Sequence, residues 1–339
     1  MCEPTPWSGL THFCMEVTFY MKRRATILAA AALILLSLCL GFAPAAAAAA
    51  QPSPTAKPAT AANTAPIAEN LELTTYRGVS VGGKLSATDP EGDALSFSLT
   101  TPPIKGELSL QPDGSFVYAP LDGKKGKDYF GFRATDANGN VSQEATVIVK
   151  IEKQKTTIHY QDMAYSPDAY AATFLAENNV FVGEQLGGEY LFDPGKAVSR
   201  GEFLAMCMKV VNTKLLSGVS RTGFSDDADM PAWVKPYVST ALMSGVISGY
   251  GEAGAATFDA NAPVSYSEAA VILNRVLGVA DVSTVDTNLG ATPVWAYQSV
   301  ANMVACNVMP KGGDALQLSI TRGEAADMLL NAMDLIRSR

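Results

Sequence analysis

The spacing of hydrophobic residues changes in character near residue 155 of the chain. Between residues 65 and about 153, apolar and polar residues alternate in short runs such as ALSFSLT (94–100), SFVYAP (115–120) and ATVIVKI (145–151). Turn-forming sequences rich in Gly, Pro, Asn and Asp separate these runs, among them DPEGD and DANGN. Because alternation is typical of strands with one buried face, we expect a small antiparallel β-sandwich of about seven strands here.

From Tyr160 onward, apolar residues recur with the spacing of a helix. Three stretches place them on one helical face: Phe203, Met206, Cys207 and Val210; Ala269, Ile272, Leu273 and Val276; and Ala325, Met328, Leu329, Ala332, Met333 and Ile336. A pattern of this period predicts amphipathic helices. The C-terminal half is therefore expected to be all-α.

The helical half also repeats itself. The sequence FDPGKAVSRGE at 192–202 matches FDANAPVSYSE at 258–268, with every residue shifted by 66 positions. A third copy, SITRGEA at 319–325, keeps Ser/Thr-x-x-Glu, and PAW at 231–233 corresponds to PVW at 293–295. Three units of about 60 residues, each a helix, a loop and a second helix, indicate a repeat architecture in which one unit alone cannot bury its apolar face.

Each copy has a hydroxyl residue followed three positions later by glutamate, just before an apolar run. The pairs are Ser199 with Glu202, Ser265 with Glu268, and Thr321 with Glu324. In a capping box the hydroxyl accepts a hydrogen bond from the third helical N–H, and the glutamate reaches back to the N–H of the cap residue. Since loss of such a cap costs about 1 kcal/mol, the Ser/Thr and Glu have a sufficient structural explanation.

The arginine of the motif lacks such an explanation. Arg200 and Arg322 follow the capping residue in the first and third copies, while Tyr266 occupies that position in the second. A cation at the first helical position gains nothing from the helix dipole. It is either a solvated surface residue or a group that grips an anion such as a carboxylate. The residues themselves leave both interpretations open.

The first 64 residues are expected to lie outside the folded domains. Residues 21–50 combine a basic start, an apolar run and an alanine-rich end, which is typical of a secretory signal peptide. A retained membrane anchor is the alternative, and lipidation of Cys39 is disfavoured because Leu38 precedes it. We interpret residues 1–20 as an extension of the gene model and residues 51–64 as a flexible Ala/Pro/Thr linker.

Composition narrows the range of functions. The chain has 339 residues, 48% of them hydrophobic, and a net charge of −8. Because phosphate binding needs clustered Lys and Arg, an acidic chain argues against a nucleic-acid partner. Cys207 and Cys306 lie in helix-like stretches, where two buried thiols are favoured over a disulfide.

Catalysis finds little support in the sequence. His159 is the one histidine beyond the predicted signal peptide, so neither a Ser-His or Cys-His dyad nor a His-rich metal site can be assembled. We therefore expect that the protein is not an enzyme. A hydrolase that uses paired carboxylates is the remaining enzyme alternative.

Several motifs of the β half point to a known family. They are Asn63, Pro66, ATDPEGD (87–93), PDGSFVYAP (112–120), KDYFGF and ATDANGN. With them, residues 65–153 resemble the bacterial cadherin-like and immunoglobulin-like surface domains. In related domains acidic residues at such turns hold calcium, so the resemblance nominates Glu69, Asp89, Asp93 and Asp136. The same sequences also form plain turns, and otherwise we expect no cofactor.

The helical half resembles a second family. It has an F-x-D opening, a Trp-containing first helix, an F-x-P loop and a T-R-x-E helix start, which resemble S-layer homology (SLH) repeats at 160–217, 224–280 and 285–339. The resemblance implies a pseudo-threefold helical unit whose grooves bind pyruvylated secondary cell-wall polysaccharide. It assigns Arg200 and Arg322 to the ligand carboxylate and Trp233 and Trp295 to the groove walls. The alternative for either Trp is a core aromatic in its own unit.

The three copies depart from the family pattern in different ways. In the second copy, Tyr266 and Ser267 replace Arg and Gly. In the first copy, Pro167 occupies the position at which the other two have Trp. The third copy lacks a clear F-x-D and F-x-P. We therefore expect one or two working grooves rather than three.

Together these features predict a multi-domain, secreted, non-enzymatic cell-surface protein. An all-β sandwich would be displayed by an all-α SLH region that is anchored non-covalently to the cell wall or S-layer. The alternatives are an adhesin or matrix component, in which the sandwich binds a protein or glycan still to be identified, and a subunit of an ordered surface lattice.

Overall fold

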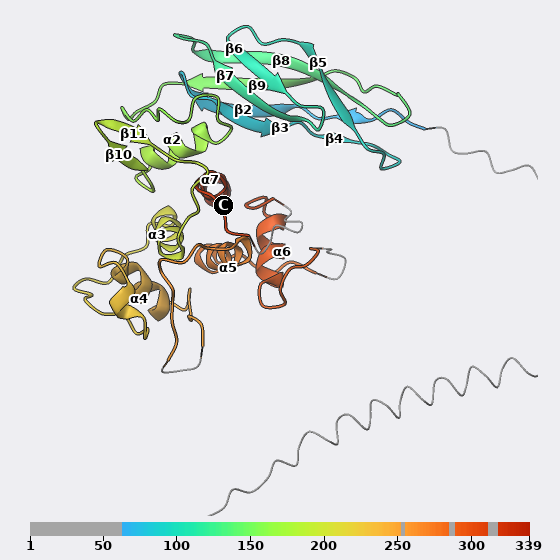
Figure 1. Ribbon diagram of the computed structural model, residues 1–339. Helices are drawn as coiled ribbons and strands as arrows, with labels where there is room; N and C mark the ends of the chain where they lie inside the picture. The colour runs from blue at the N-terminus through green and yellow to red at the C-terminus, as the bar shows by residue number, and fades with distance from the viewer. Residues whose placement is uncertain (1–62, 252–254, 285–288, 311–317) are drawn as a thin grey trace, which may run out of the picture. The chain divides into compact units, whose positions relative to one another are not determined.

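The computed structural model describes residues 63–251, 255–284, 289–310 and 318–339 (Figure 1). The predicted extension at 1–20, the signal peptide at 21–50 and nearly all of the linker at 51–64 lie outside the described residues. Within the described part, no helix has the length and apolar character needed to cross a membrane.

Two β-sheets pack face to face in the N-terminal region, as the alternating pattern predicts (Figure 1). The larger sheet has the order β2-β9-β8-β5 and the smaller β3-β7-β6. Phe116 of the smaller sheet meets Phe130 of the larger edge-on, with ring centroids 5.4 Å apart. The strands are β1 (Ile67–Ala68), β2 (Leu71–Tyr76), β3 (Val81–Lys84), β4 (Ala87–Thr88), β5 (Ser96–Thr101), β6 (Gly106–Leu110), β7 (Ser115–Pro120), β8 (Gly126–Thr135) and β9 (Ala145–Glu152).

One strand pairing differs from the predicted antiparallel sandwich. Strand β2 runs parallel to β9, with Leu71 opposite Val147 and Tyr76 opposite Glu152. Parallel neighbours need a long connection, and all the strands between β2 and β9 provide it. Periodicity also misses β2 itself, because the alternation in LELTTY breaks at its two threonines.

The C-terminal region is helical, with one small hairpin. Its elements are α2 (Ala169–Glu177), β10 (Glu184–Leu186), β11 (Glu189–Leu191), α3 (Arg200–Val210), the 3₁₀ turn η1 (Asp227–Asp229), α4 (Lys235–Met243), α5 (Tyr266–Leu277), α6 (Tyr297–Ala305) and α7 (Arg322–Ser338). The expectation of an all-α region is therefore wrong for β10 and β11. Gly187 and Gly188 join these strands with positive φ angles of 62° and 91°, which the tightest hairpin turns require.

The segments in front of α3, α5 and α7 meet in the interior of the helical region. The N–H of Val198 donates to the carbonyl of Ile320 at 3.1 Å, that of Val264 to Val198 at 2.9 Å, and that of Ile320 to Val264 at 3.0 Å. These bonds form a closed ring, and the three side chains are buried. Each segment thus completes its backbone hydrogen bonds only when the other two are in place.

Each of these helices begins with a capping box. The hydroxyl groups of Ser199, Ser265 and Thr321 accept a hydrogen bond from the N–H of the glutamate three residues later. That glutamate accepts in return from the N–H of the cap residue, at 3.0, 2.8 and 2.7 Å respectively. The caps therefore hold the first turn of each helix where it leaves the ring.

Replacing Ser265 with alanine should lower the free energy of unfolding of the helical region by about 1 kcal/mol, because the third helical N–H of α5 loses its acceptor. Ser265→Gly should cost only a few tenths of a kcal/mol. Urea unfolding followed by circular dichroism at 222 nm measures both. The control is Ser239→Ala, because the Ser239 hydroxyl is buried and has no hydrogen-bond partner among the described residues. An equal loss of stability in Ser265→Ala and Ser239→Ala would contradict the assignment of Ser265 as the cap of α5.

Candidate functional site

Two aspartates shape the loops that lead into α3 and α5. Asp162 accepts the N–H groups of Phe192 and of the residue after it, at 3.0 and 2.6 Å. Asp226 does the same for Phe258 and the residue after it, at 3.1 and 2.8 Å. Both phenylalanines are buried. Asp162 ends the sequence YQD (160–162) and Asp226 ends FSD (224–226), so the opening aspartates of the first two units are loop anchors, a role that motif spacing does not reveal.

The N-terminus of each arginine-bearing helix lies on the loop of another unit. The first two N–H groups of α3 donate to the carbonyls of Ala262 and Ala260, both at 2.8 Å. Those of α7 donate to Lys196 and Pro194, at 2.8 and 3.0 Å. A Cβ atom on Gly201 would lie 3.0 Å from the Ala260 carbonyl oxygen, which explains the small residue after the arginine in α3. The motif arginines therefore project over a neighbouring loop rather than their own.

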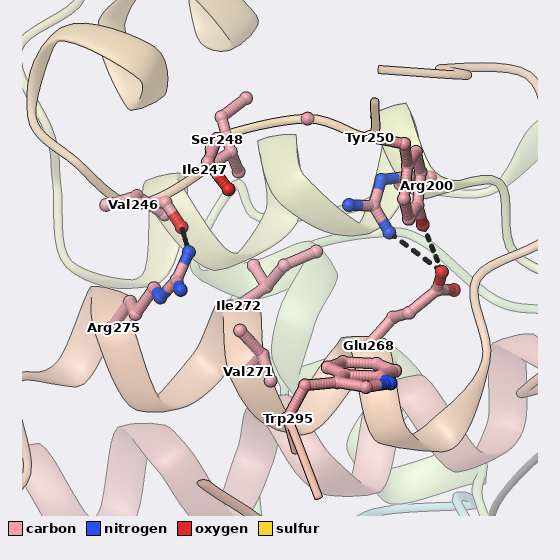
Figure 2. Close-up of a pocket in the computed structure, with 11 residues that line it drawn as sticks. Arg200, Val246, Ile247, Ser248, Tyr250, Glu268, Val271, Ile272, Arg275 and Trp295 are labelled. Carbon is pink, nitrogen blue, oxygen red and sulfur yellow. Dashed lines mark hydrogen bonds and ion pairs between the residues drawn. The ribbon is translucent and has the colours of Figure 1, made fainter. Parts of the chain in front are cut away.

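Arg200 lines a groove of about 380 Å³, which lies in the range of small-ligand sites (Figure 2). The segment from Val246 to Tyr250 forms one side, and Glu268, Val271, Ile272 and Arg275 of α5 form another. Trp295, which precedes α6, completes the lining and is 61% exposed. The groove thus combines two arginines, one carboxylate, one phenol and one open aromatic face.

Most of the Arg200 guanidinium is enclosed, yet its donors are incompletely used. The residue is 9% exposed, and its Cζ lies 4.5 Å from the ring centroid of Tyr250 and 5.1 Å from that of Phe258. Its Nη1 is 3.1 Å from Glu268 Oε1, an ion pair whose angles do not make it a hydrogen bond. Its Nε is buried with no hydrogen-bond partner among the described residues.

Glu268 is held in place by its neighbours. Its carboxylate accepts the Ser265 N–H at 2.8 Å and the hydroxyl of Tyr250. Burial raises the pKa of Glu268, but these hydrogen bonds and the charge of Arg200 outweigh burial, so that the net shift is downward. Burial and then the bond to Glu268 raise the pKa of Tyr250. At neutral pH Arg200 therefore faces a carboxylate and a neutral phenol.

The two predicted tryptophans have different surroundings. Trp295 lines the same groove as Arg200 and lies beside Glu268 (Figure 2), and its role as a groove wall for a ligand stays a prediction. Trp233 is 53% exposed and stacks edge-on against Tyr237, with centroids 6.4 Å apart, but it does not line the Arg200 groove. Since both rings are exposed, neither is a core aromatic.

Arg322 is more fully occupied than Arg200. It is 5% exposed, its Nη1 donates to the carbonyl of Phe192 at 3.1 Å, and its Nη2 donates to Glu184 Oε1 at 2.8 Å. Glu202 lies 4.0 Å away. Hydrogen bonds and charge from Lys196 and Arg322 lower the pKa of Glu184 to about 2. Neither Glu184 nor Tyr250 is predicted as a site residue from the sequence. Each directly follows a glycine, Gly183 or Gly249, and these two glycines align at the 66-residue offset.

The residues nominated for calcium are partly brought together. Asp136 accepts from the Asn63 amide at 2.6 Å, and Asp93 accepts from the Asn138 amide at 2.7 Å. Asn138 also donates to Asn63 at 3.0 Å. Asp89 Oδ1 binds backbone N–H groups of its own turn, and Glu69 is exposed. Among the described residues no three His, Cys, Asp or Glu side chains converge, so calcium binding stays a prediction.

Two domain families match this chain. Residues 63–153 match the bacterial cadherin-like domain and residues 223–270 match the S-layer homology domain. The chain carries a domain of each kind. The second match covers Tyr250 and Glu268, so part of the Arg200 groove belongs to the SLH domain.

Individual relatives cover only parts of the chain. The Surface-layer 125 kDa protein of Lysinibacillus sphaericus is 26% identical over 191 residues, which are 52% of this chain and 15% of the relative. Human protocadherin-24 EC1-2 is 15% identical at a TM-score of 0.24, over 27% of this chain and 46% of that one. The endo-fucoidan hydrolase MfFcnA4 is 21% identical at a TM-score of 0.23, over 28% and 14%. At these TM-scores neither structure establishes a relationship to this chain.

The ion pair of Arg322 and Glu184 should survive acidification to pH 4. A carboxylate whose folded pKa is lowered stabilises the folded state above its unfolded pKa, and that contribution is lost only as the pH falls toward the folded value. The carboxyl ¹³C shift of Glu184 should therefore titrate at a pH of about 2. Lys196→Ala should move the midpoint upward, because Lys196 is the largest cause of the shift. A midpoint near 4.5 in both proteins would show that the pair does not form.

Proposed function

We propose that this chain is a non-enzymatic cell-surface protein that the SLH region anchors to an acidic secondary cell-wall polysaccharide. The ligand would be a pyruvate ketal of a sugar residue, whose carboxylate is the anion that a motif arginine would grip. The cadherin-like domain would be displayed beyond the anchor.

The observation that carries this proposal is the state of Arg200. An arginine that is 9% exposed, with a buried Nε that lacks a partner among the described residues, is costly unless something completes its hydrogen bonds. Arginine binds carboxylates through two parallel N–H donors. Beside it, the exposed face of Trp295 offers the kind of surface against which a sugar ring packs.

The arrangement of the helices supports the same assignment. We propose that residues 160–217, 224–280 and 285–339 are three SLH repeats about an approximate threefold axis. The ring through Val198, Val264 and Ile320 is the contact expected for such an axis, because each segment donates to one neighbour and accepts from the other. The reach of Arg200 over the next repeat's loop follows from the same geometry.

The relative's name favours a second role. A protein called a surface-layer protein matches half of this chain, so we also consider a subunit of a surface lattice. Light scattering separates the two roles: growth of large assemblies with protein concentration, in the absence of wall polymer, favours the lattice. A chain that stays monomeric and binds the wall favours the anchor.

Arg200→Ala should weaken binding to purified cell-wall sacculi by about tenfold or more, because a hydrogen bond to a charged group contributes about 1.5–3 kcal/mol. Co-sedimentation of the full chain over a range of sacculus concentrations measures the affinity. Sacculi stripped of their secondary polysaccharide should bind neither protein.

The matched control is Arg221→Ala, which removes an exposed arginine from the same helical region. It should bind like the unmodified chain. Equal sedimentation of Arg200→Ala and Arg221→Ala would show that Arg200 does not carry the binding. Undiminished binding to stripped sacculi would show that another wall polymer is the ligand.

A further inference from the structure

Arg200 and Arg322 hold the same position in their helices, but they meet different partners. Each is the first residue of its helix, each is nearly buried, and each lies over an aromatic ring of another unit's loop. The ring nearest to Arg322 is that of Phe181, at 5.3 Å. The two sites therefore share a scaffold, and their differences come from a few side chains.

The donors of Arg322 are used by groups of the protein itself. Nη2 donates to Glu184 at 2.8 Å and Nη1 to the Phe192 carbonyl at 3.1 Å. A carboxylate on an arginine at this distance reproduces the contact that an acidic ligand would make. Arg200 has an ion pair with Glu268 but no hydrogen bond of this kind at Nε or Nη1 among the described residues.

The difference maps to one position of the repeated loop. Glu184 and Tyr250 align at the 66-residue offset, and each follows a glycine of positive φ, 78° at Gly183 and 76° at Gly249. In one loop this position places a carboxylate against Arg322. In the other it places a phenol ring against Arg200, and the hydroxyl of that phenol holds Glu268.

A second aligned position supports the first. Lys196 Nζ lies 2.7 Å from Glu184 Oε1, so the carboxylate is shared between two cations. At the same offset the other loop has Ala262. The pair Glu184 and Lys196 is thus replaced by Tyr250 and Ala262, which removes both the carboxylate and the lysine that fixes it.

We propose that Glu184 is an internal ligand that occupies Arg322, so that the Arg200 groove is the one that takes the acidic sugar. The inference rests on the proposed function and names the residue that decides which arginine is available. An external carboxylate would have to displace one that is tethered to the same chain and therefore present at high effective concentration. The low pKa of Glu184 keeps this contact in place across the ordinary pH range.

Exchange of the aligned residues tests the inference in the full chain. The probe is a methyl hexoside with a 4,6-pyruvate ketal, and its control is the same sugar with an uncharged 4,6-isopropylidene ketal. Calorimetry should give one site in the unmodified chain and a loss of about tenfold or more in affinity for Arg200→Ala. Adding Glu184→Tyr to Arg200→Ala should restore a site, and adding Arg322→Ala to that pair should remove it again.

The reverse exchange closes the open groove. Tyr250→Glu with Ala262→Lys should reduce binding as much as Arg200→Ala does, with Arg200 unchanged. Glu184→Gln in the Arg200→Ala chain is the conservative variant, since it removes the charge and keeps the size. Thermal unfolding by circular dichroism establishes that each variant is folded before it is titrated.

The outcomes separate this inference from the proposed function. Full binding by Arg200→Ala would show that Arg322 is available to the ligand despite Glu184 and would overturn the inference alone. The inference alone would also be overturned if neither Glu184→Tyr nor Glu184→Gln restores a site in the Arg200→Ala chain while the unmodified chain binds the pyruvate ketal. If the chain binds the uncharged ketal as tightly as the pyruvate ketal, the proposed function and this inference are both overturned. The same follows if no variant binds either ketal.

Discussion

The helical region depends on the ring of backbone hydrogen bonds through Val198, Val264 and Ile320. Buried N–H and C=O groups must be paired, and here each segment supplies the partner that another one lacks. No one segment can therefore adopt its buried conformation independently. The capping boxes follow directly after the ring, so the ring also fixes where each helix starts and in which direction its first residue points. The position of the arginines over a neighbouring loop is a consequence of this closure and not of local preference.

That position is unfavourable for an arginine in two ways. The positive end of the helix dipole repels a cation, and burial removes its hydration. Arg322 compensates with a carboxylate, a carbonyl and a ring face. Arg200 has two aromatic faces and an ion pair, which offset part of the cost. A buried cation with donors to spare breaks the rule that buried polar groups are satisfied, and such exceptions concentrate at functional sites.

Local patterns predict the features that are determined locally. Alternation finds most of the sandwich strands, and Ser/Thr-x-x-Glu finds the three helix starts, because a strand face or a cap depends on residues a few positions apart. The parallel pairing of β2 with β9 depends on the path of the whole domain, and periodicity carries no information about it. Gly187-Gly188 is a turn signal for the hairpin β10–β11, but the hairpin is not predicted from the sequence because it lies between helical segments. The partners Glu184 and Arg322 are 138 residues apart, so only the assembled ring brings them together.

A repeated backbone presents equivalent positions to different side chains, so function can diverge without a change of fold. The first helical residue is Arg200 in α3, Tyr266 in α5 and Arg322 in α7. Arg322 donates to a side-chain carboxylate of another loop, whereas the Tyr266 hydroxyl donates to the carbonyl of Pro310. In both cases the group at the helix start already has an acceptor from the protein. Because the ring and the caps carry the fold, these positions are free to vary, and a single residue such as Tyr250 or Glu184 changes which group of the chain meets the arginine.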